Sequence, residues 1–82
     1  METILIIDDD ESFGETLEIF LGDMHCRILR TNNGKEGLDI VEREHPDLVI
    51  TDYKMPLLNG LQVLKSIKEI DEKIQVIMLT AF

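Results

Sequence analysis

Several oxygen-bearing side chains in this sequence each come directly after a short apolar run. They are Asp8, Asp9 and Asp10 after the first run, Asp52 after the second and Thr80 after the third. Carboxylates that converge repel one another and raise the pKa of at least one member, unless a cation neutralises them. Carboxylate oxygens are ligands that a hard cation such as Mg²⁺ prefers, and a carboxylate beside such a cation can attack a phosphoryl group and form an aspartyl phosphate. These residue types therefore indicate metal-assisted phosphoryl chemistry, provided that the fold brings them together.

The elements that must position these residues alternate along the chain. Continuous Val, Ile and Leu runs predict buried parallel strands, and apolar residues at helical spacing predict helices between them. We predict strands over Thr3–Ile7, Cys26–Thr31, Leu48–Asp52 and Ile74–Leu79, and helices over Glu11–Leu21, Lys35–Glu44 and Gly60–Ile70. The β-α-β-α-β-α-β order implies right-handed crossovers and an α/β, doubly wound parallel sheet. The carboxyl ends of parallel strands share one edge, where ligands bind, so the aspartates and Thr80 are expected to meet there.

Each of these residues taken alone also has a plainer interpretation. The aspartate run fits the charged N-terminus of the helix that follows it. Asp52 fits a solvated residue leaving a strand, and Thr80 fits a structural hydroxyl. Their joint placement at three strand ends is much less expected by chance, and it favours a shared site.

Length, charge and cysteine content bound the class of protein. The 82 residues form at most one small domain, 1–82, of ordinary soluble composition. A formal net charge of −9 argues against nucleic acid or an anionic membrane as a direct partner, because phosphate binding depends on clustered Lys and Arg. The single Cys26 excludes an internal disulfide and fits a reducing cytoplasm. No signal peptide and no run of transmembrane length is recognisable.

Five further residues have structural and not catalytic interpretations. Arg27 and Arg30 indicate that the second strand lies at an edge of the sheet, and Cys26 beside it is interpreted as a buried, inert thiol. His25 and His45 lack metal-ligand spacing, so surface or capping roles are expected.

Three motifs resemble a known family. They are Ile-Leu-Ile-Ile-Asp-Asp-Asp at 4–10, Pro-Asp-Leu-Val-Ile-Thr-Asp-Tyr-Lys-Met-Pro from residue 46 with Asn59-Gly60 downstream, and Val-Ile-Met-Leu-Thr-Ala at 76–81. In order and spacing the chain resembles the receiver domain of two-component response regulators, in particular receivers of the nitrogen-regulatory activator type. The resemblance covers the whole chain. It implies a flavodoxin-like fold with strand order 2-1-3-4.

The resemblance also implies roles for individual residues. Asp52 matches the phosphoacceptor that takes a phosphoryl group from a histidine kinase, and Thr80 matches the switch hydroxyl. Asp8 and Asp9, together with Asp52 and the main-chain carbonyl of Lys54, match the set that binds Mg²⁺. By the same resemblance the chain is a phosphoacceptor in signal transduction and not an enzyme. Asp10 is interpreted as a helix-start residue. Gly37 stands where the family often has alanine, a substitution that weakens a helix by roughly 1 kcal/mol.

The family also has a last helix-strand-helix segment, with a lysine that pairs with the phosphoryl group. No such segment follows residue 82, and neither Lys54 nor Lys65 matches that lysine. We therefore expect an incomplete receiver sheet with an open edge, and self-association through it. The alternative function is a signalling-inert fragment that acts as an oligomerisation or interaction module. The Asp-x-Asp pattern of haloacid-dehalogenase phosphatases also fits Asp8–Asp10, but it gives the motif at Asp52 no role.

Overall fold

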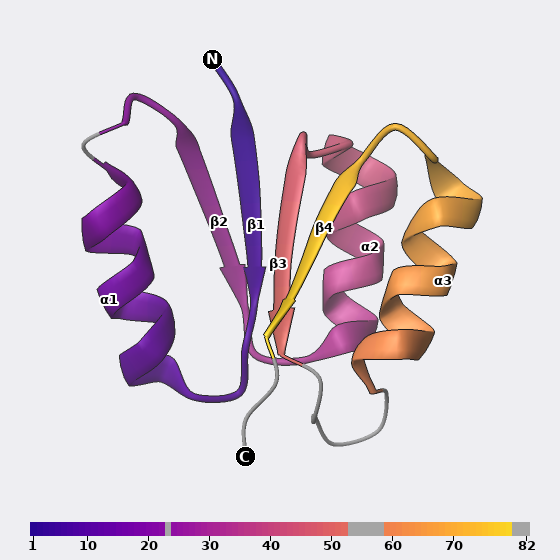
Figure 1. The fold of residues 1–82 in the computed structure, drawn as a ribbon, viewed down its shortest axis with the longest axis horizontal. Helices are drawn as coiled ribbons and strands as arrows, with labels where there is room; N and C mark the ends of the chain where they lie inside the picture. Colours follow the sequence, from indigo (N-terminus) through magenta and orange to yellow (C-terminus); the bar gives the residue numbers. More distant parts are fainter. Residues whose placement is uncertain (23, 53–58, 80–82) are drawn as a thin grey trace.

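The structure, a computed structural model, describes residues 1–22, 24–52 and 59–79. In this part of the chain a parallel sheet of four strands has helices on both faces (Figure 1). The strands are β1 (Thr3–Ile7), β2 (Arg27–Thr31), β3 (Leu48–Asp52) and β4 (Gln75–Leu79). The helices are α1 (Glu11–Gly22), α2 (Gly34–Glu44) and α3 (Gly60–Ile70). The predicted alternation is confirmed, with boundaries that shift by one residue at β2, β4, α1 and α2.

The strand order within the described sheet is β2-β1-β3-β4, as the resemblance implies. The register aligns Ile7 with Thr31 on one side and with Thr51 on the other, and it aligns Asp52 with Leu79. The strands therefore end at one edge, at the bottom of Figure 1. The edge position predicted for the arginine-containing strand is confirmed, because β2 is the first strand in the order.

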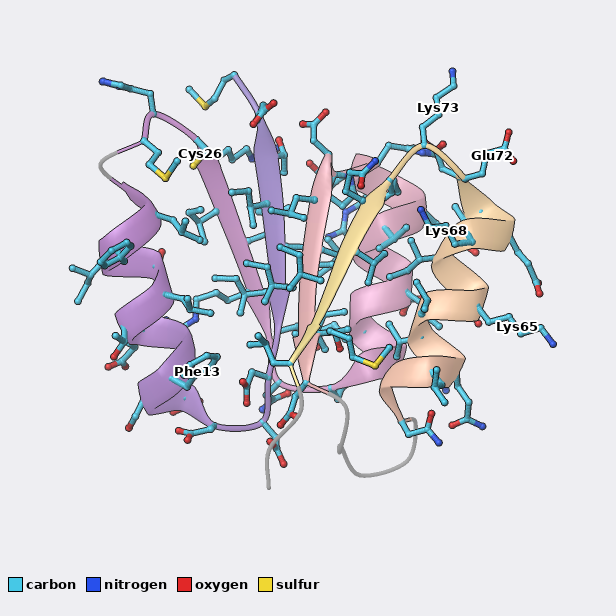
Figure 2. All side chains as sticks on the ribbon, in the orientation of Figure 1. Phe13, Cys26, Lys65, Lys68, Glu72 and Lys73 are labelled. Carbon is cyan, nitrogen blue, oxygen red and sulfur yellow. The ribbon has the colours of Figure 1, made fainter. Side chains whose placement is uncertain are left out.

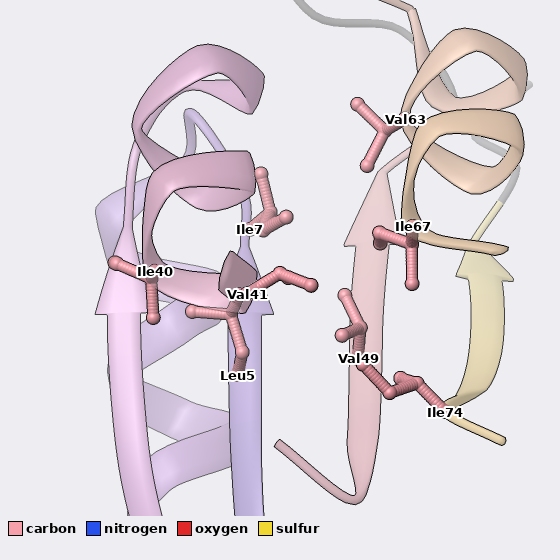
Figure 3. Packing of buried hydrophobic residues seen from close by; sticks show 8 residues of the cluster. All are labelled: Leu5, Ile7, Ile40, Val41, Val49, Val63, Ile67 and Ile74. Atoms are coloured by element: carbon pink, nitrogen blue, oxygen red, sulfur yellow. The ribbon is translucent and has the colours of Figure 1, made fainter. Parts of the chain in front are cut away.

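The main core lies between the sheet and the pair α2 and α3 (Figure 3). Side chains alternate between the two faces of a strand, so Leu5 and Ile7 of β1 both point to this side. The buried members of the cluster are Leu5, Ile7, Ile40, Val41, Val49, Val63, Ile67 and Ile74. Burying one aliphatic side chain of this size contributes about 1.5–3 kcal/mol, so this cluster is the principal source of stability.

The opposite face is covered by α1 and has a smaller core. Its buried members are Ile4, Ile6 and Ile50, and partly buried side chains of α1, β2 and β4 pack around them. Toward β4 the cover is incomplete, because Ile77 is 47% exposed while Ile50, its register partner, is 7% exposed. Within the described residues, the α1 side of the sheet is therefore the less completely covered face.

Gly37 allows a close approach of α2 to β1. A Cβ atom at this position would lie 2.5 Å from Cδ1 of Ile7 and 3.0 Å from its Cγ1. The sequence suggested only a weaker helix at Gly37. The tertiary structure adds a reason for glycine, because a side chain there would displace a fully buried isoleucine.

Two of the predicted structural roles, those of His45 and Cys26, concern the ends of elements. His45 is the C-cap of α2 in a left-handed conformation, with φ of 45°, so the capping role is confirmed. Cys26 is half-buried and not fully buried as predicted, and its thiol donates a hydrogen bond to the Leu21 carbonyl over 3.3 Å. Among the described helices none is long and apolar enough to cross a membrane.

Candidate functional site

The loop after β1 brings the first aspartates to the edge where the strands end. The Asp8 backbone N–H donates to the Thr31 carbonyl of β2 over 3.1 Å. Oδ1 of the Asp8 side chain accepts from the Asp10 N–H over 2.8 Å, which turns the chain toward α1. Asp8 is half-buried and Asp9 is exposed. The loop is thus held by β2 on one side and by its own aspartate on the other.

Asp10 performs a different task from its two neighbours. Its Oδ1 accepts from the backbone N–H groups of Ser12 at 3.0 Å and Phe13 at 3.3 Å. N–H groups in the first turn of a helix have no carbonyl partner within the helix, and an N-cap side chain such as Asp10 accepts their hydrogen bonds instead. The interpretation of Asp10 as a helix-start residue is confirmed, and its carboxylate is directed to the helix.

Asp8, Asp9 and Asp52 come together at this edge. Each offers a carboxylate oxygen, and these oxygens all lie within 4.8 Å of one another. Asp52 is the last residue of β3, half-buried, and β3 lies beside β1 in the sheet. The convergence expected from the sequence is therefore present for three of the predicted site residues.

The electrostatics of the cluster are unfavourable without a counter-charge. The pKa of Asp8 is raised above its ordinary value of 3.8, chiefly because the carboxyl is partly buried. The hydrogen bond from the Asp10 N–H opposes this rise in pKa, while the negative charges of Asp52, Asp9 and Asp10 add to it. A bound cation would remove the repulsion between these carboxylates, because an opposite charge within a few ångströms favours the ionised form.

The donor set fits a hard divalent cation. All three candidate ligands are carboxylates, and oxygen donors from carboxylate, carbonyl and water are what Mg²⁺ and Ca²⁺ take. The partial exposure of the cluster leaves room for the water molecules that Mg²⁺ usually retains. The residues present thus form an acidic cluster able to hold a metal ion.

Two of the predicted site residues lie outside the described residues. Lys54 falls in the segment 53–58 and Thr80 in the segment 80–82. Their neighbours in the chain are placed, because Asp52 and Leu79 are register partners at the ends of β3 and β4. The other residues of the loop motif, Tyr53 and Pro56, also fall in the first segment.

Lys65 takes no part in the cluster. It is exposed on α3, and Figure 2 shows its side chain pointing outward from that helix, away from the sheet. This position agrees with the expectation that Lys65 does not match the phosphoryl-pairing lysine of the family.

Arg30 is a further residue near the site, although its sequence position indicates only a strand at the edge of the sheet. Its side chain lies between β2 and α1, beside a cavity of about 380 Å³ that also borders Asp8. One signal was available in the sequence. Ile28 packs toward α1, so the two-residue period of a strand places Arg30 on the same inward face.

Comparisons with known proteins agree with this geometry. A family model for the response regulator receiver domain matches residues 4–82. The sporulation initiation phosphotransferase F of Bacillus subtilis (strain 168) is 41% identical over 81 residues, which are 99% of this chain and 65% of that protein. A probable transcriptional regulator, ycf27 of Porphyridium aerugineum, is 39% identical over 80 residues, or 98% of this chain and 33% of that protein.

A solved structure gives the same result for the fold. The crystal structure of a response regulator receiver domain protein from Clostridium thermocellum superposes with a TM-score of 0.92 at 35% sequence identity. The match covers 98% of this chain and 65% of that one, so the chain spans about two thirds of the length of this structure. With the family model matched over residues 4–82 and the acidic cluster in place, the chain belongs to the response regulator receiver domain family of two-component signal transduction.

Proposed function

We propose that this chain accepts a phosphoryl group on Asp52 from a phosphohistidine of a histidine kinase, with Mg²⁺ held by Asp8, Asp9 and Asp52. The observation that carries the proposal is the convergence of these three carboxylates within 4.8 Å at the carboxyl edge of the sheet. A relative with 41% identity is itself named a phosphotransferase. The chain acts here as a stoichiometric acceptor and not as an enzyme with its own turnover.

The transfer requires little covalent chemistry from the protein. A carboxylate oxygen of Asp52 attacks the phosphorus, the phosphorus–nitrogen bond to the histidine breaks, and the imidazole nitrogen leaves with the bonding pair and regains a proton from water. Bound Mg²⁺ supplies the positive charge that lets an anionic phosphoryl group approach an acidic cluster. Asp8 and Asp9 contribute by position, because β1 ends beside β3 and directs both toward Asp52.

Two further residues complete the proposed site by family resemblance. The main-chain carbonyl of Lys54 would add a fourth oxygen to the metal ligands, and the Thr80 hydroxyl would donate a hydrogen bond to a phosphoryl oxygen. Each follows a strand that ends at this edge, β3 and β4 respectively. A hydrogen bond to a charged group contributes about 1.5–3 kcal/mol, so Thr80→Ala is expected to weaken retention of the phosphoryl group without abolishing transfer.

The proposal is tested with a small phosphoryl donor such as acetyl phosphate and intact-mass measurement. With Mg²⁺ present, the wild-type chain should gain the mass of one phosphoryl group, and Asp52→Asn should gain none. Asp47→Asn is the matched control, because Asp47 is an aspartate at the opposite end of the sheet and should leave the reaction unchanged. No adduct on the wild type at saturating donor, or an adduct that persists in Asp52→Asn, would overturn the proposal.

The kinase and the compartment follow as part of the same proposal. Proteins of this family are partners of histidine kinases, so the donor is a phosphohistidine on a separate protein or domain. A reaction of this kind and a single reduced thiol at Cys26 are both typical of the cytoplasm, where we propose that the chain acts.

A second candidate function is self-association, and one observation favours it. Ile77 is 47% exposed on the α1 side of β4, beside the buried Ile50, so this part of the sheet offers apolar surface to a second copy of the chain. Molar mass measured by light scattering should then exceed that of a monomer and fall toward it in Ile77→Lys. A monomer at all concentrations would contradict this candidate and leave phosphoacceptance unaffected.

A further inference from the structure

Arg30 joins the edge strand β2 to α1. Its Nη1 lies 3.0 Å from Oε1 of Glu18, and its Nη2 donates to the Glu11 carbonyl over 3.1 Å. The side chain is 29% exposed, so it is partly enclosed between the strand and the helix. One side chain thus contacts two turns of the same helix.

Gly14 lies between these two contacts, and its lack of a side chain makes room for the guanidinium. A Cβ atom at position 14 would lie 3.0 Å from Nε, 3.1 Å from Nη2 and 3.3 Å from Cζ of Arg30. Gly14 is buried in the middle of α1, where glycine is about 1 kcal/mol less favourable than alanine on helix propensity alone. The glycine is therefore best explained by the space that Arg30 occupies.

The anchored helix begins directly after the acidic loop. Glu11 is the first residue of α1, and Asp10 caps it while donating its own N–H to Asp8. On the other side, the Thr31 carbonyl next to Arg30 accepts the Asp8 N–H. The last two residues of β2 therefore hold both ends of the loop that carries Asp8 and Asp9.

We propose that Arg30, seated on Gly14, is a positioning residue that sets the affinity of the acidic cluster for a divalent cation by fixing the loop 8–11 between β2 and α1. The inference rests on the metal site of the proposed function. Arg30 acts through the Glu11 carbonyl and the start of α1, and it contacts none of the three metal-ligand candidates by any hydrogen bond that the described residues show.

Charge and position predict opposite effects when Arg30 is replaced. Removing a positive charge near three carboxylates makes the local potential more negative, so electrostatics alone predicts tighter binding of a cation. Loosening the loop instead weakens binding, since residues that orient metal ligands typically change metal affinity by about 10- to 100-fold. Arg30 acts at one remove from the ligands, so we expect a loss at the lower end of that range, about tenfold.

The test is a titration of the 82-residue chain with Mg²⁺, in which NMR chemical shifts of the Asp9 and Asp10 backbone amides report binding. Arg30→Met removes both the charge and the contacts, while Arg30→Lys keeps the charge but loses the fork that reaches Glu11 and Glu18 together. Gly14→Ala leaves Arg30 in the chain and requires its guanidinium to give way by a few tenths of an ångström. The control is Arg27→Met, because Arg27 lies on the same strand at its other end and pairs with Glu44 at 2.7 Å.

The expected result is weaker Mg²⁺ binding in Arg30→Met, Arg30→Lys and Gly14→Ala, with Arg27→Met unchanged. Replacing Arg30 by Ala together with Gly14→Ala should be no worse than Arg30→Ala alone, since both changes act on one contact. If Arg30→Met binds more tightly and Arg30→Lys is unchanged, Arg30 acts only by charge and the inference is wrong. Equal affinity in all variants overturns it as well.

The inference and the proposed function fail in different ways. If the wild-type chain shows no Mg²⁺-dependent shift at Asp9 and Asp10, the metal site itself is wrong. If the wild type binds Mg²⁺ and the Arg30 and Gly14 variants bind equally well, only the positioning role is wrong. Dispersed amide spectra of Arg30→Lys and Gly14→Ala establish that each variant is folded, so a lost affinity is not a lost fold.

Discussion

The two ends of the sheet use aspartates in opposite ways. At the amino end, Asp47 accepts the Thr3 N–H on Oδ2 over 2.8 Å, and its own N–H donates to the Thr3 carbonyl over 2.8 Å. Its carbonyl accepts the Gln75 N–H over 3.1 Å. One aspartate thereby ties the starts of β1 and β4 to the segment before β3. At the carboxyl end, Asp8, Asp9 and Asp52 face one another instead.

The pKa shifts record the same difference. Asp71 is the C-cap of α3 and lies at the amino end of the sheet. Its pKa is lowered, first by the hydrogen bond from the Lys73 N–H and then by the His45 side chain at 3.3 Å. The pKa of Asp8 at the carboxyl end is raised, first by partial burial and then by neighbouring carboxylates. At one end, donors stabilise the ionised carboxyl and so favour the folded state. At the other, repulsion between carboxylates is retained, in a cluster that could hold a metal ion.

The difference between the two ends should be most evident when metal is added. A ligand that binds only the folded state stabilises it by about 2.7 kcal/mol at a concentration about 100 times its Kd. We therefore expect Mg²⁺ to raise the unfolding free energy of the wild-type chain by this amount, measured by urea unfolding. In a variant with both Asp8→Asn and Asp9→Asn, the stabilisation should be lost.

The matched variant at the amino end is Asp71→Asn. Its stabilisation by Mg²⁺ should equal that of the wild type, because Asp71 is not one of the clustered carboxylates. If Mg²⁺ stabilises the double variant as strongly as the wild type, the cation binds elsewhere and the contrast between the two ends is not one of metal binding.

A smaller effect is expected from Asp8→Asn in metal-free protein. Because the folded pKa of Asp8 is raised, the ionised carboxyl destabilises the fold above its ordinary pKa of 3.8, and the destabilisation disappears as pH falls below that value. The variant keeps the Oδ1 acceptor for the Asp10 N–H and removes the charge. With a chelator present at about pH 7, we expect a gain of up to about 1 kcal/mol, the upper range for partly exposed charges.

Thermal unfolding at neutral and acidic pH measures this effect directly. The gain in stability should shrink toward zero in acid, where the wild-type Asp8 carboxyl is protonated and therefore as neutral as the asparagine. If the variant is less stable than the wild type at neutral pH, the ionised Asp8 carboxylate stabilises the fold more through its hydrogen bond than it destabilises the fold through burial and repulsion.

The smallest effect is expected at the amino end, from Asp71→Asn, and it has the opposite sign. The lowered pKa of Asp71 means that its ionised form stabilises the fold above the ordinary value of 3.8, and that this contribution is lost as pH falls through the lowered pKa. Asp71→Asn should therefore lower the melting temperature slightly at neutral pH and leave it unchanged in strong acid. An equal loss at every pH would point to the hydrogen bonds alone and not to the charge.

Much of the fold was predictable because the pattern is local and repeated. Continuous aliphatic runs such as Ile4–Ile7, helix stop signals and alternating periods specify the order of the elements, and parallel strands must end at one edge. Asp8 and Asp52 could therefore be placed together from the sequence. Element boundaries were less certain, because Cys26 and Ile74 precede their strands by one residue and no local signal separates them from the strand.

The position of the Arg30 side chain was not predictable in this way. A charged residue in a weak strand usually indicates exposure at an edge, and β2 is indeed an edge strand. The side chain nevertheless turns inward to Glu11 and Glu18. It fits there because Gly14, sixteen positions earlier, has no side chain. Gly37 and Ile7 give a second example of a glycine whose reason lies in another element.

The sequence by itself determined the alternation of strands and helices, the family, and which aspartates end which strands, because each depends on residue type and spacing along one segment. Only the tertiary structure decided that the Arg30 side chain turns inward to lie on Gly14, and that Gly37 lies against Ile7. Those outcomes depend on distances between segments, which sequence spacing does not specify. They are set when the helices pack on the sheet and each buried or half-buried polar group must find a hydrogen-bond partner.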